Sequence, residues 1–443
     1  MKCLKKLLFL PLISTLLFSC SSSINNVGKW LKIDTTELTI DTTYNGVKAS
    51  PFGTVMKINY FKNEKKNYSD SFDEELKEYY FERVSLYHKI FDRHYKYYFD
   101  DSKESIYSSI RVINDSYATG REIPCSPSLY NLLKEGVEYT KISKGYFNFF
   151  IGNLVDYWDE VLDEVCSGAN ILEYDPYFST TKQEELNAIV ASNPSIDEID
   201  NLLTFNDDNM SVMFNSIEDV KYNGTTLERS KTNSKYRPII SCGGFAKGEA
   251  TKLIKQDLLA KGYKDGYLNS GSSSITLLSK PKFAEKGYIS LKYADPRKSS
   301  FEREAAISLN IYDEVNISAS GNYTSGLSYY IKDENGKPLI YRHHIVNPYT
   351  GENPQFHSQV LLISKYFDAG FLDMLSTAMF NMSLDDCLSF RKELLKKFCK
   401  SDLQMVLFDM DQSDKESMNI YSTSNFNNSL SLLVEKAKVI YLE

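Results

Sequence analysis

The sequence predicts an α+β fold in which mixed or antiparallel sheets are flanked by helices. Short strand-like runs with turns between them occupy the second half of the chain, and amphipathic helical segments lie before and among them. No long linker rich in proline, glycine or serine divides residues 30–443, and no internal repeat is visible. We therefore expect one large domain, or two closely joined lobes.

The first half of the chain begins with two expected strands, at residues 36–40 and 53–60. A helix is expected next, because large apolar residues recur at spacings of three and four and form one face: Leu76, Tyr80, Val84, Tyr87 and Phe91. Ser126-Pro127 is typical of a helix start, and a second apolar face follows it: Leu129, Leu132, Leu133 and Val137.

Residues 163–236 show the weakest patterns, so we expect surface structure there and assign it no chemistry. A short helix near 184–191 and a hairpin turn at Asn223-Gly224 are the features expected in it. The elements expected after this region are a short strand at 239, a helix that ends near Gly262, strands at 290–293, 306–311 and 359–363, and a helix at 371–380.

The composition is that of a packed globular protein. Of 443 residues, 42% are hydrophobic, and 51 Lys and Arg residues oppose 59 Asp and Glu residues, which gives a formal net charge of −8. Disordered, collagenous and disulfide-scaffold proteins are thereby excluded, and an acidic chain has no overall field that attracts nucleic acid. Five of the seven cysteines follow Cys20, and their odd number and wide spacing indicate neither a disulfide framework nor a zinc site.

The N-terminus resembles a bacterial lipoprotein signal. Three lysines in the first six residues precede an apolar run at 7–18 that is too short and too interrupted to span a bilayer comfortably. The run ends in Leu17-Phe18-Ser19-Cys20, which resembles a lipobox; the alternative is an ordinary signal peptide followed by a chance cysteine. We expect a signal peptide at 1–19, a tether at 20–30 and one domain at 31–443, anchored through lipidated Cys20 to the extracytoplasmic face of the cell membrane.

Three clusters further along carry candidate chemistry, of which the first is a glycine loop. The segment Ser241-Cys242-Gly243-Gly244-Phe245-Ala246-Lys247-Gly248 places glycines between a strand and a helix N-terminus. Free backbone N–H groups and the helix dipole favour a phosphate or diphosphate there. The segment matches neither a Walker loop nor a dinucleotide fingerprint, and a tight strand-to-helix turn would explain it equally well.

The second cluster is the pair Asp373 and Thr377, four residues apart on one face of the last expected helix. Two hard oxygens so placed suit Mg²⁺, which usually completes its coordination with substrate phosphates and water. A capping or solvated aspartate beside a core-facing threonine is the plainer interpretation of the pair alone.

The third cluster is the histidine pair His343-His344, which runs into a turn at 347–351. Neutral imidazole can accept a proton from a hydroxyl nucleophile at neutral pH, so one of the pair is a candidate general base, although a structural role is more common for a histidine. Shortly before it, the small residues around Ser320 bring backbone amides and hydroxyls close to whatever binds.

In this order, the clusters resemble the FAD:protein FMN transferase family of ApbE-like lipoproteins. Counterparts of six family motifs occur in order and at plausible intervals over residues 50–380. They are Phe52-Gly53-Thr54, then 143–148 with Leu154-Val155 and Trp158, then 243–248, Ala319 to Tyr323, the His343-His344 cluster, and Asp373 to Ala378. Each motif is modest, but six together are hard to obtain by chance.

The resemblance implies a Mg²⁺-dependent reaction in which FAD is cut at its diphosphate, AMP leaves, and FMN is esterified to a Ser or Thr of an extracytoplasmic or membrane flavoprotein. By position, Asp373, Thr377 and the main-chain carbonyl of Ala246 would hold the metal. The catalytic candidates would be His344, as the base or its close partner, with Ser320 and Asn347. The FAD site would be lined by Phe52, Tyr146, Phe147, Asn148, Gly243, Gly244 and Lys247.

The departures from the family pattern all replace a negatively charged residue with a neutral one. Asn148, Asn322 and Asn347 stand where the family has aspartates, and Ser241 replaces another in the glycine loop. Because Asn347 can only hydrogen-bond to a base, a slower base is expected. We favour a divergent active enzyme. The alternatives are a lipoprotein that binds FAD without transferring it, and an adhesin or solute-binding lipoprotein without flavin, against which the retained metal-ligand pair argues.

Overall fold

The computed structural model describes residues 28–38, 43–44, 47–48, 50–94, 99–100, 106–298, 304–322, 327–410, 417–423 and 429–442. The expected signal peptide, Cys20 and most of the expected tether lie outside the described residues. Within the described ranges, no helix combines the length and the apolar character needed to cross a membrane.

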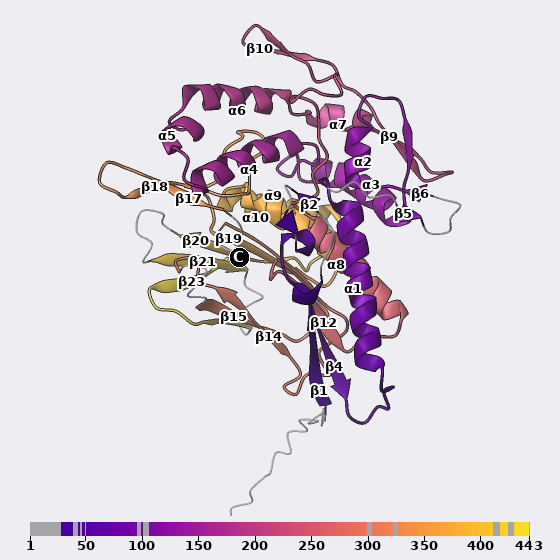
Figure 1. The fold of residues 1–443 in the computed structure, drawn as a ribbon. Coiled ribbons are helices and arrows are strands. Elements are labelled where there is room, and N and C mark those ends of the chain that lie inside the picture. Colours follow the sequence, from indigo (N-terminus) through magenta and orange to yellow (C-terminus); the bar gives the residue numbers. More distant parts are fainter. Residues whose placement is uncertain are drawn as a thin grey trace, which may run out of the picture.

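A nine-stranded sheet forms the centre of the described part of the chain (Figure 1). Neighbouring strands in it are antiparallel, except for the last pair, which is parallel. In spatial order the strands are β1 (Gly28–Asp34), β4 (Met56–Asn63), β12 (Gly266–Ser270), β13 (Ser274–Leu277), β16 (Asn316–Gly321), β19 (Gln359–Ser364), β20 (Gln404–Met410), β21 (Met418–Thr423) and β23 (Ala437–Leu442).

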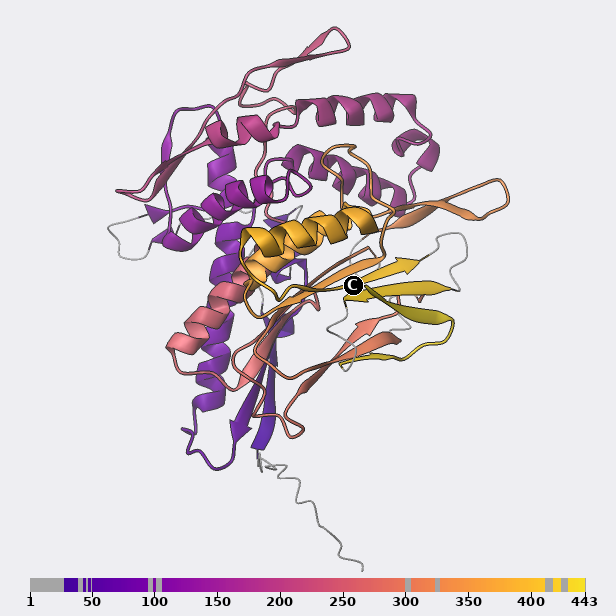
Figure 2. The ribbon, with the colours of Figure 1, turned by 180° about the vertical axis from the view of Figure 1, so that it is seen from behind.

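Both faces of this sheet are buried in its middle. Every residue of β19 is buried, and Val360 and Leu362 join the core on one side while Leu361 and Ile363 join the core on the other. Helices cover the first face, and a smaller sheet covers the second, as the view from behind shows (Figure 2). The smaller sheet consists of β14 (Ile289–Ala294), β15 (Ala305–Ile311) and β22 (Leu430–Leu432).

Helices contribute most of the core on the first face. Those that pack there are α1 (Phe72–Phe91), α3 (Pro127–Ile142), α8 (Ala246–Ala260), α9 (Ala369–Phe380) and α10 (Leu384–Lys397). A separate apolar cluster joins α4 (Gly152–Cys166) to α6 (Thr180–Ser192). The remaining helical turns are α2 (Ile110–Asp115), α5 (Ile171–Tyr174), α7 (Ile196–Leu202) and the 3₁₀ segments η1 (Thr35–Glu37) and η2 (Pro51–Gly53).

Short strands complete the described structure. β7 (Glu122–Pro124), β9 (Ser211–Phe214) and β8 (Leu203–Asn206) form a three-stranded sheet. The two-stranded pairs are β2 (Thr43–Tyr44) with β3 (Val47–Lys48), β5 (Phe99–Asp100) with β6 (Ile106–Tyr107), β10 (Val220–Tyr222) with β11 (Thr225–Leu227), and β17 (Tyr329–Lys332) with β18 (Pro338–Arg342).

The α+β prediction is confirmed, and so are the expected helices. All five residues of the expected aromatic-rich face are buried in α1. Ser126 caps α3 by accepting a hydrogen bond from the Leu129 N–H, and Gly262, with φ +88°, follows the end of α8. The hairpin turn at Asn223-Gly224 joins β10 to β11, with both residues at positive φ as such two-residue turns require.

Two expected strands are wrong. Of the strand expected at 36–40, residues 39–40 lie outside the described residues; residues 35–37 form a 3₁₀ turn instead, because the Asp34 side chain accepts the Thr36 N–H and caps the turn. Ile239 makes only an isolated bridge with Ile151, since the chain turns at once into the glycine loop. The second expected strand begins at Met56 rather than residue 53, and α10 and the strands after it were not expected.

Candidate active site

A cavity of about 540 Å³ lies within the described residues, a size typical of cofactor sites. Its walls come from η2, the segment after α3, α4, the glycine loop, the β12–β13 turn, β16, the segment after β18, and α9. The lining includes these residues expected from the sequence: Phe52, Tyr146, Phe147, Asn148, Gly243, Gly244, Lys247, Ser320, His344, Asp373 and Thr377. Ala246 and Asn347 are not among the lining residues.

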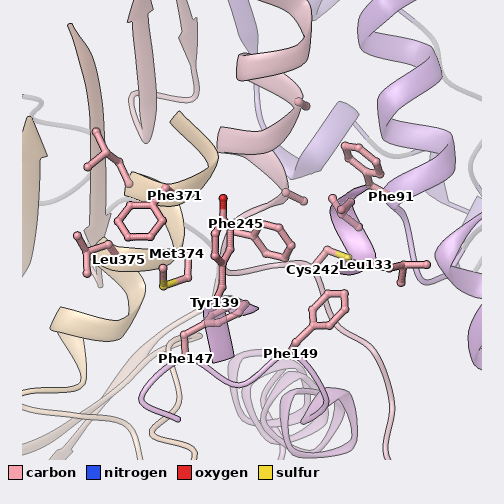
Figure 3. Close-up of a cluster of buried hydrophobic side chains, with 14 of the residues drawn as sticks. Phe91, Leu133, Tyr139, Phe147, Phe149, Cys242, Phe245, Phe371, Met374 and Leu375 are labelled. Atoms are coloured by element: carbon pink, nitrogen blue, oxygen red, sulfur yellow. The ribbon is translucent and has the colours of Figure 1, made fainter. Parts of the chain in front are cut away.

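The glycine loop is held by an aromatic cluster behind it. Phe245 packs edge to face against Tyr139, Phe147 and Phe149, with ring centroids 5.5 to 5.7 Å apart (Figure 3). Gly244 must be small, because a Cβ there would lie 2.9 Å from the Phe147 ring and 3.2 Å from Thr377 Cγ2. The loop is therefore rigid on its core side and presents backbone to the cavity.

Asp373 is fixed by a close crossing of α8 and α9. Its Oδ2 accepts the Gly248 N–H at 2.8 Å and its Oδ1 accepts the Ser318 hydroxyl at 3.0 Å. A Cβ on Gly248 would lie 2.2 Å from the Ala369 carbonyl oxygen, so only glycine permits this approach. Burial raises the pKa of Asp373 above its usual range, and the positive charge of Lys247 and the two hydrogen bonds oppose that shift.

A chain of hydroxyl groups starts at the carboxylate, because Ser318, which donates to it, lies 3.2 Å from Ser376, oxygen to oxygen. Thr377 Oγ1 bonds to the Gly244 carbonyl at 2.9 Å, and Ser320 lies 2.7 Å from Ser376 and 3.3 Å from Thr377, oxygen to oxygen. Thr377 thus contacts the main-chain carbonyl of Gly244. Ala246, expected to supply a carbonyl to the metal, is the first residue of α8, and that role stays a prediction. In the described residues, no three His, Cys, Asp or Glu side chains group together as a metal site.

The structure separates the two adjacent histidines. His343 is fully buried; its Nε2 faces the Pro354 carbonyl at 3.0 Å and its Nδ1 accepts the Ile345 N–H, so both ring nitrogens serve the fold. His344 instead exposes its side chain to the cavity. Protein surrounds that cavity, and burial, followed by the charge of Lys247, lowers the pKa of His344 to about 4. At neutral pH its ring is a neutral base.

The three asparagines that stand where the family has aspartates make the same kind of contact. Asn148, Asn322 and Asn347 each direct the amide nitrogen at a backbone carbonyl, respectively those of Pro194, His357 and Asn381, at 3.4 to 3.5 Å. A carboxylate there would place oxygen against oxygen. Asn347 also accepts the Tyr349 N–H through its side-chain oxygen, so it holds the turn after His344.

A buried ion pair supports the histidine segment. Arg342 donates from Nε and Nη2 to both carboxylate oxygens of Asp175, at 2.9 and 3.0 Å, and its guanidinium stacks 4.8 Å from the Trp158 ring. Asp175 is fully buried and Arg342 nearly so. The expectation that 163–236 is only surface structure is therefore wrong at Asp175, which ties this region to the residue two places before His344.

Removing Asp175 should be strongly destabilising. An Asp175→Ala variant leaves Arg342 with Glu352 alone, and breaking a buried pair costs roughly 3–5 kcal/mol of unfolding free energy. Urea unfolding measures this loss. Arg342→Met added to Asp175→Ala should recover part of it, because the uncompensated charge is gone; a double variant less stable than Asp175→Ala would contradict the account.

Several lining residues were not predicted as site residues from the sequence, and Asp159 and Ser273 are two polar examples. Asp159 on α4 has a half-exposed side chain that opens on the cavity, and the surrounding protein raises its pKa to about 6, opposed by Arg93. Ser273 lies in the β12–β13 turn with its hydroxyl 3.5 Å from Asp373 Oδ1. The run of serines and glycine at 270–274 was a signal for a turn near a ligand; Asp159 carried none.

The chain matches a known family over most of its length. A model of the ApbE family matches residues 52–398. No curated protein sequence matches the chain significantly.

Solved structures show the same fold. The ApbE protein of Thermotoga maritima is 20% identical, with a TM-score of 0.55 over 86% of this chain and 94% of that one. The flavin transferase ApbE of Vibrio cholerae is 15% identical, with a TM-score of 0.54 over 91% and 99%. The apo flavinyl transferase ApbE of Pseudomonas stutzeri is 14% identical, with a TM-score of 0.53 over 91% and 97%.

Proposed function

The chain belongs to the ApbE family, and from this we propose that it is a flavin transferase that cleaves FAD and attaches FMN to a protein hydroxyl. A Ser or Thr oxygen of the acceptor attacks the phosphorus of the FMN half, the bond from that phosphorus to the bridging oxygen breaks, and AMP leaves. One observation supports this most: a neutral histidine, a buried aspartate among hydroxyls and a glycine loop open on one cavity.

Different residues of this chain would bind the flavin ring, bind the diphosphate and accept the proton. His344 accepts the proton of the attacking hydroxyl, because its lowered pKa leaves the ring unprotonated at neutral pH. Lys247 and the glycine loop at the N-terminus of α8 offset the negative charge of the diphosphate. The aromatic side chains of Phe52, Tyr146 and Phe147 supply apolar walls for the planar flavin ring.

The residues around Asp373 fit a hard divalent cation such as Mg²⁺. Asp373, Thr377, Ser320 and the Gly244 carbonyl are all oxygen donors, which Mg²⁺ prefers, and a buried carboxylate is stabilised by a nearby cation. A single carboxylate leaves positions for substrate phosphates and water. When bound, the cation would supply positive charge to the diphosphate as it is cut.

Mass spectrometry tests the proposal. The purified protein is mixed with FAD, Mg²⁺ and a peptide bearing one Thr, and the same peptide with Val replacing that Thr is the control. We expect the Thr peptide alone to gain the mass of FMN, with an equal amount of AMP. Bound FAD with neither product would favour the alternative, a flavin-binding protein without turnover, for which the loss of charge at Asn148, Asn322 and Asn347 is the specific observation.

We also propose that the mature protein is held at the extracytoplasmic face of the cell membrane by a lipid on Cys20. The basic start, apolar run and lipobox-like Leu17-Phe18-Ser19-Cys20 support this. Cys20→Ala should release the protein from the membrane fraction or leave its precursor uncut. Partition into membranes and migration identical to the wild type would contradict it.

A further inference from the structure

The turn that carries Phe52 into the cavity wall is left-handed. Phe52 has φ 53° and ψ 26°, Gly53 has φ 66°, and the Thr54 N–H donates to the Pro51 carbonyl at 3.1 Å, as in a type I′ turn. Glycine and asparagine favour the first of these positions, and an aromatic residue is strained there. Such strain persists only where the surroundings hold the residue in place.

His88 on α1 provides that hold. Its Nδ1 accepts the Phe52 backbone N–H at 3.1 Å, and the two rings meet edge to face with centroids 5.2 Å apart. Because Nδ1 accepts, the proton lies on Nε2, which is 3.5 Å from Asp92 Oδ2. The side chain is buried, and burial lowers the pKa of His88, which keeps the ring neutral at neutral pH.

We infer that His88 is a positioning residue: it holds Phe52 in the left-handed turn and thereby sets the aromatic wall against which the planar ring of the substrate packs. His88 is not among the residues that line the cavity, so its effect passes through Phe52. The inference rests on the proposed function only for the identity of the ligand, since the hold on the turn exists without it.

Three substitutions of His88 in the full chain test this, because they differ in where they place a hydrogen-bond acceptor. His88→Asn keeps a polar acceptor near the Nδ1 position, His88→Gln moves it to the Nε2 position, and His88→Leu removes it. Lys89→Ala, the next residue on the same helix, is the matched control. FAD affinity is measured by quenching of flavin fluorescence, and backbone exchange of the peptide containing Phe52 is measured by hydrogen–deuterium exchange without FAD.

We expect His88→Asn and Lys89→Ala to bind FAD within about threefold of the wild type, and His88→Gln and His88→Leu to bind about tenfold or more weakly, as for loss of a buried hydrogen bond. Hydrogen–deuterium exchange of the peptide containing Phe52 should be faster in His88→Gln and His88→Leu than in the wild type. If His88→Leu fails to fold, the contrast of Asn with Gln carries the test.

Equal affinity and equal exchange in all variants would overturn the inference while leaving the proposed function intact. A wild-type protein that binds no FAD would overturn the proposed function instead. In that case the exchange of Phe52 still decides whether His88 holds the turn.

Discussion

An Asp373→Asn variant should lose Mg²⁺-dependent AMP release and keep its fold. The amide retains an oxygen that can accept the Gly248 N–H but carries no charge to hold a cation. Since burial already disfavours the charged form of Asp373, losing that charge should leave the unfolding free energy without Mg²⁺ unchanged or higher. AMP release is followed by chromatography over a range of Mg²⁺ concentrations.

Thermal unfolding gives a second readout that does not depend on turnover. Mg²⁺ should raise the Tm of the wild type and leave that of Asp373→Asn unchanged. Asp368→Asn is the matched control. Asp368 caps the same helix by accepting the Phe371 N–H at 2.9 Å, and it does not line the cavity. The control should keep AMP release. Equal AMP release by the wild type and Asp373→Asn at limiting Mg²⁺ would exclude the metal role.

A His344→Ala variant should transfer FMN about 10²- to 10⁴-fold more slowly, the usual worth of a well-placed general base. The side chain opens on the cavity and is not part of the apolar core, so stability should change little. Single-turnover transfer to the Thr peptide at saturating FAD measures the rate. Added imidazole should restore part of it, because the cavity left by the ring is open. Transfer at the wild-type rate would refute this mechanism.

The pH dependence supplies a further check on His344. The required neutral form is present above the folded-state pKa and is lost as the pH falls through it, so the acid limb of kcat/KM should lie near pH 4 rather than near the usual 6.5. Lys247→Met should move this limb upward, because the lysine charge is one cause of the lowered pKa. If the acid limb of the pH profile is the same in His344→Ala as in the wild type, it reports the titration of another group and contradicts this prediction.

The sequence by itself determined the features that depend on near neighbours along the chain. The spacing of apolar residues predicted α1, α3 and α9, and the interval of four between Asp373 and Thr377 placed both on one helix face. The order of the motifs indicated the family, and most of the expected site residues line one cavity. Local periodicity is enough for these features because helical geometry repeats every few residues.

Only the tertiary structure decided what depends on contacts between distant segments. The resemblance to the family had selected His344 of the two adjacent histidines, but only the structure gives the reason: the ring of His343 is buried, with its Nε2 against the Pro354 carbonyl. Asp175 acquires its role from Arg342, 167 residues away, and His88 from Phe52, 36 residues away. In the unfolded chain, Asp175 and His88 are hydrated like any other aspartate or histidine. Folding buries each side chain and brings its partner within hydrogen-bond distance. No local sequence pattern indicates which side chains will be buried in this way.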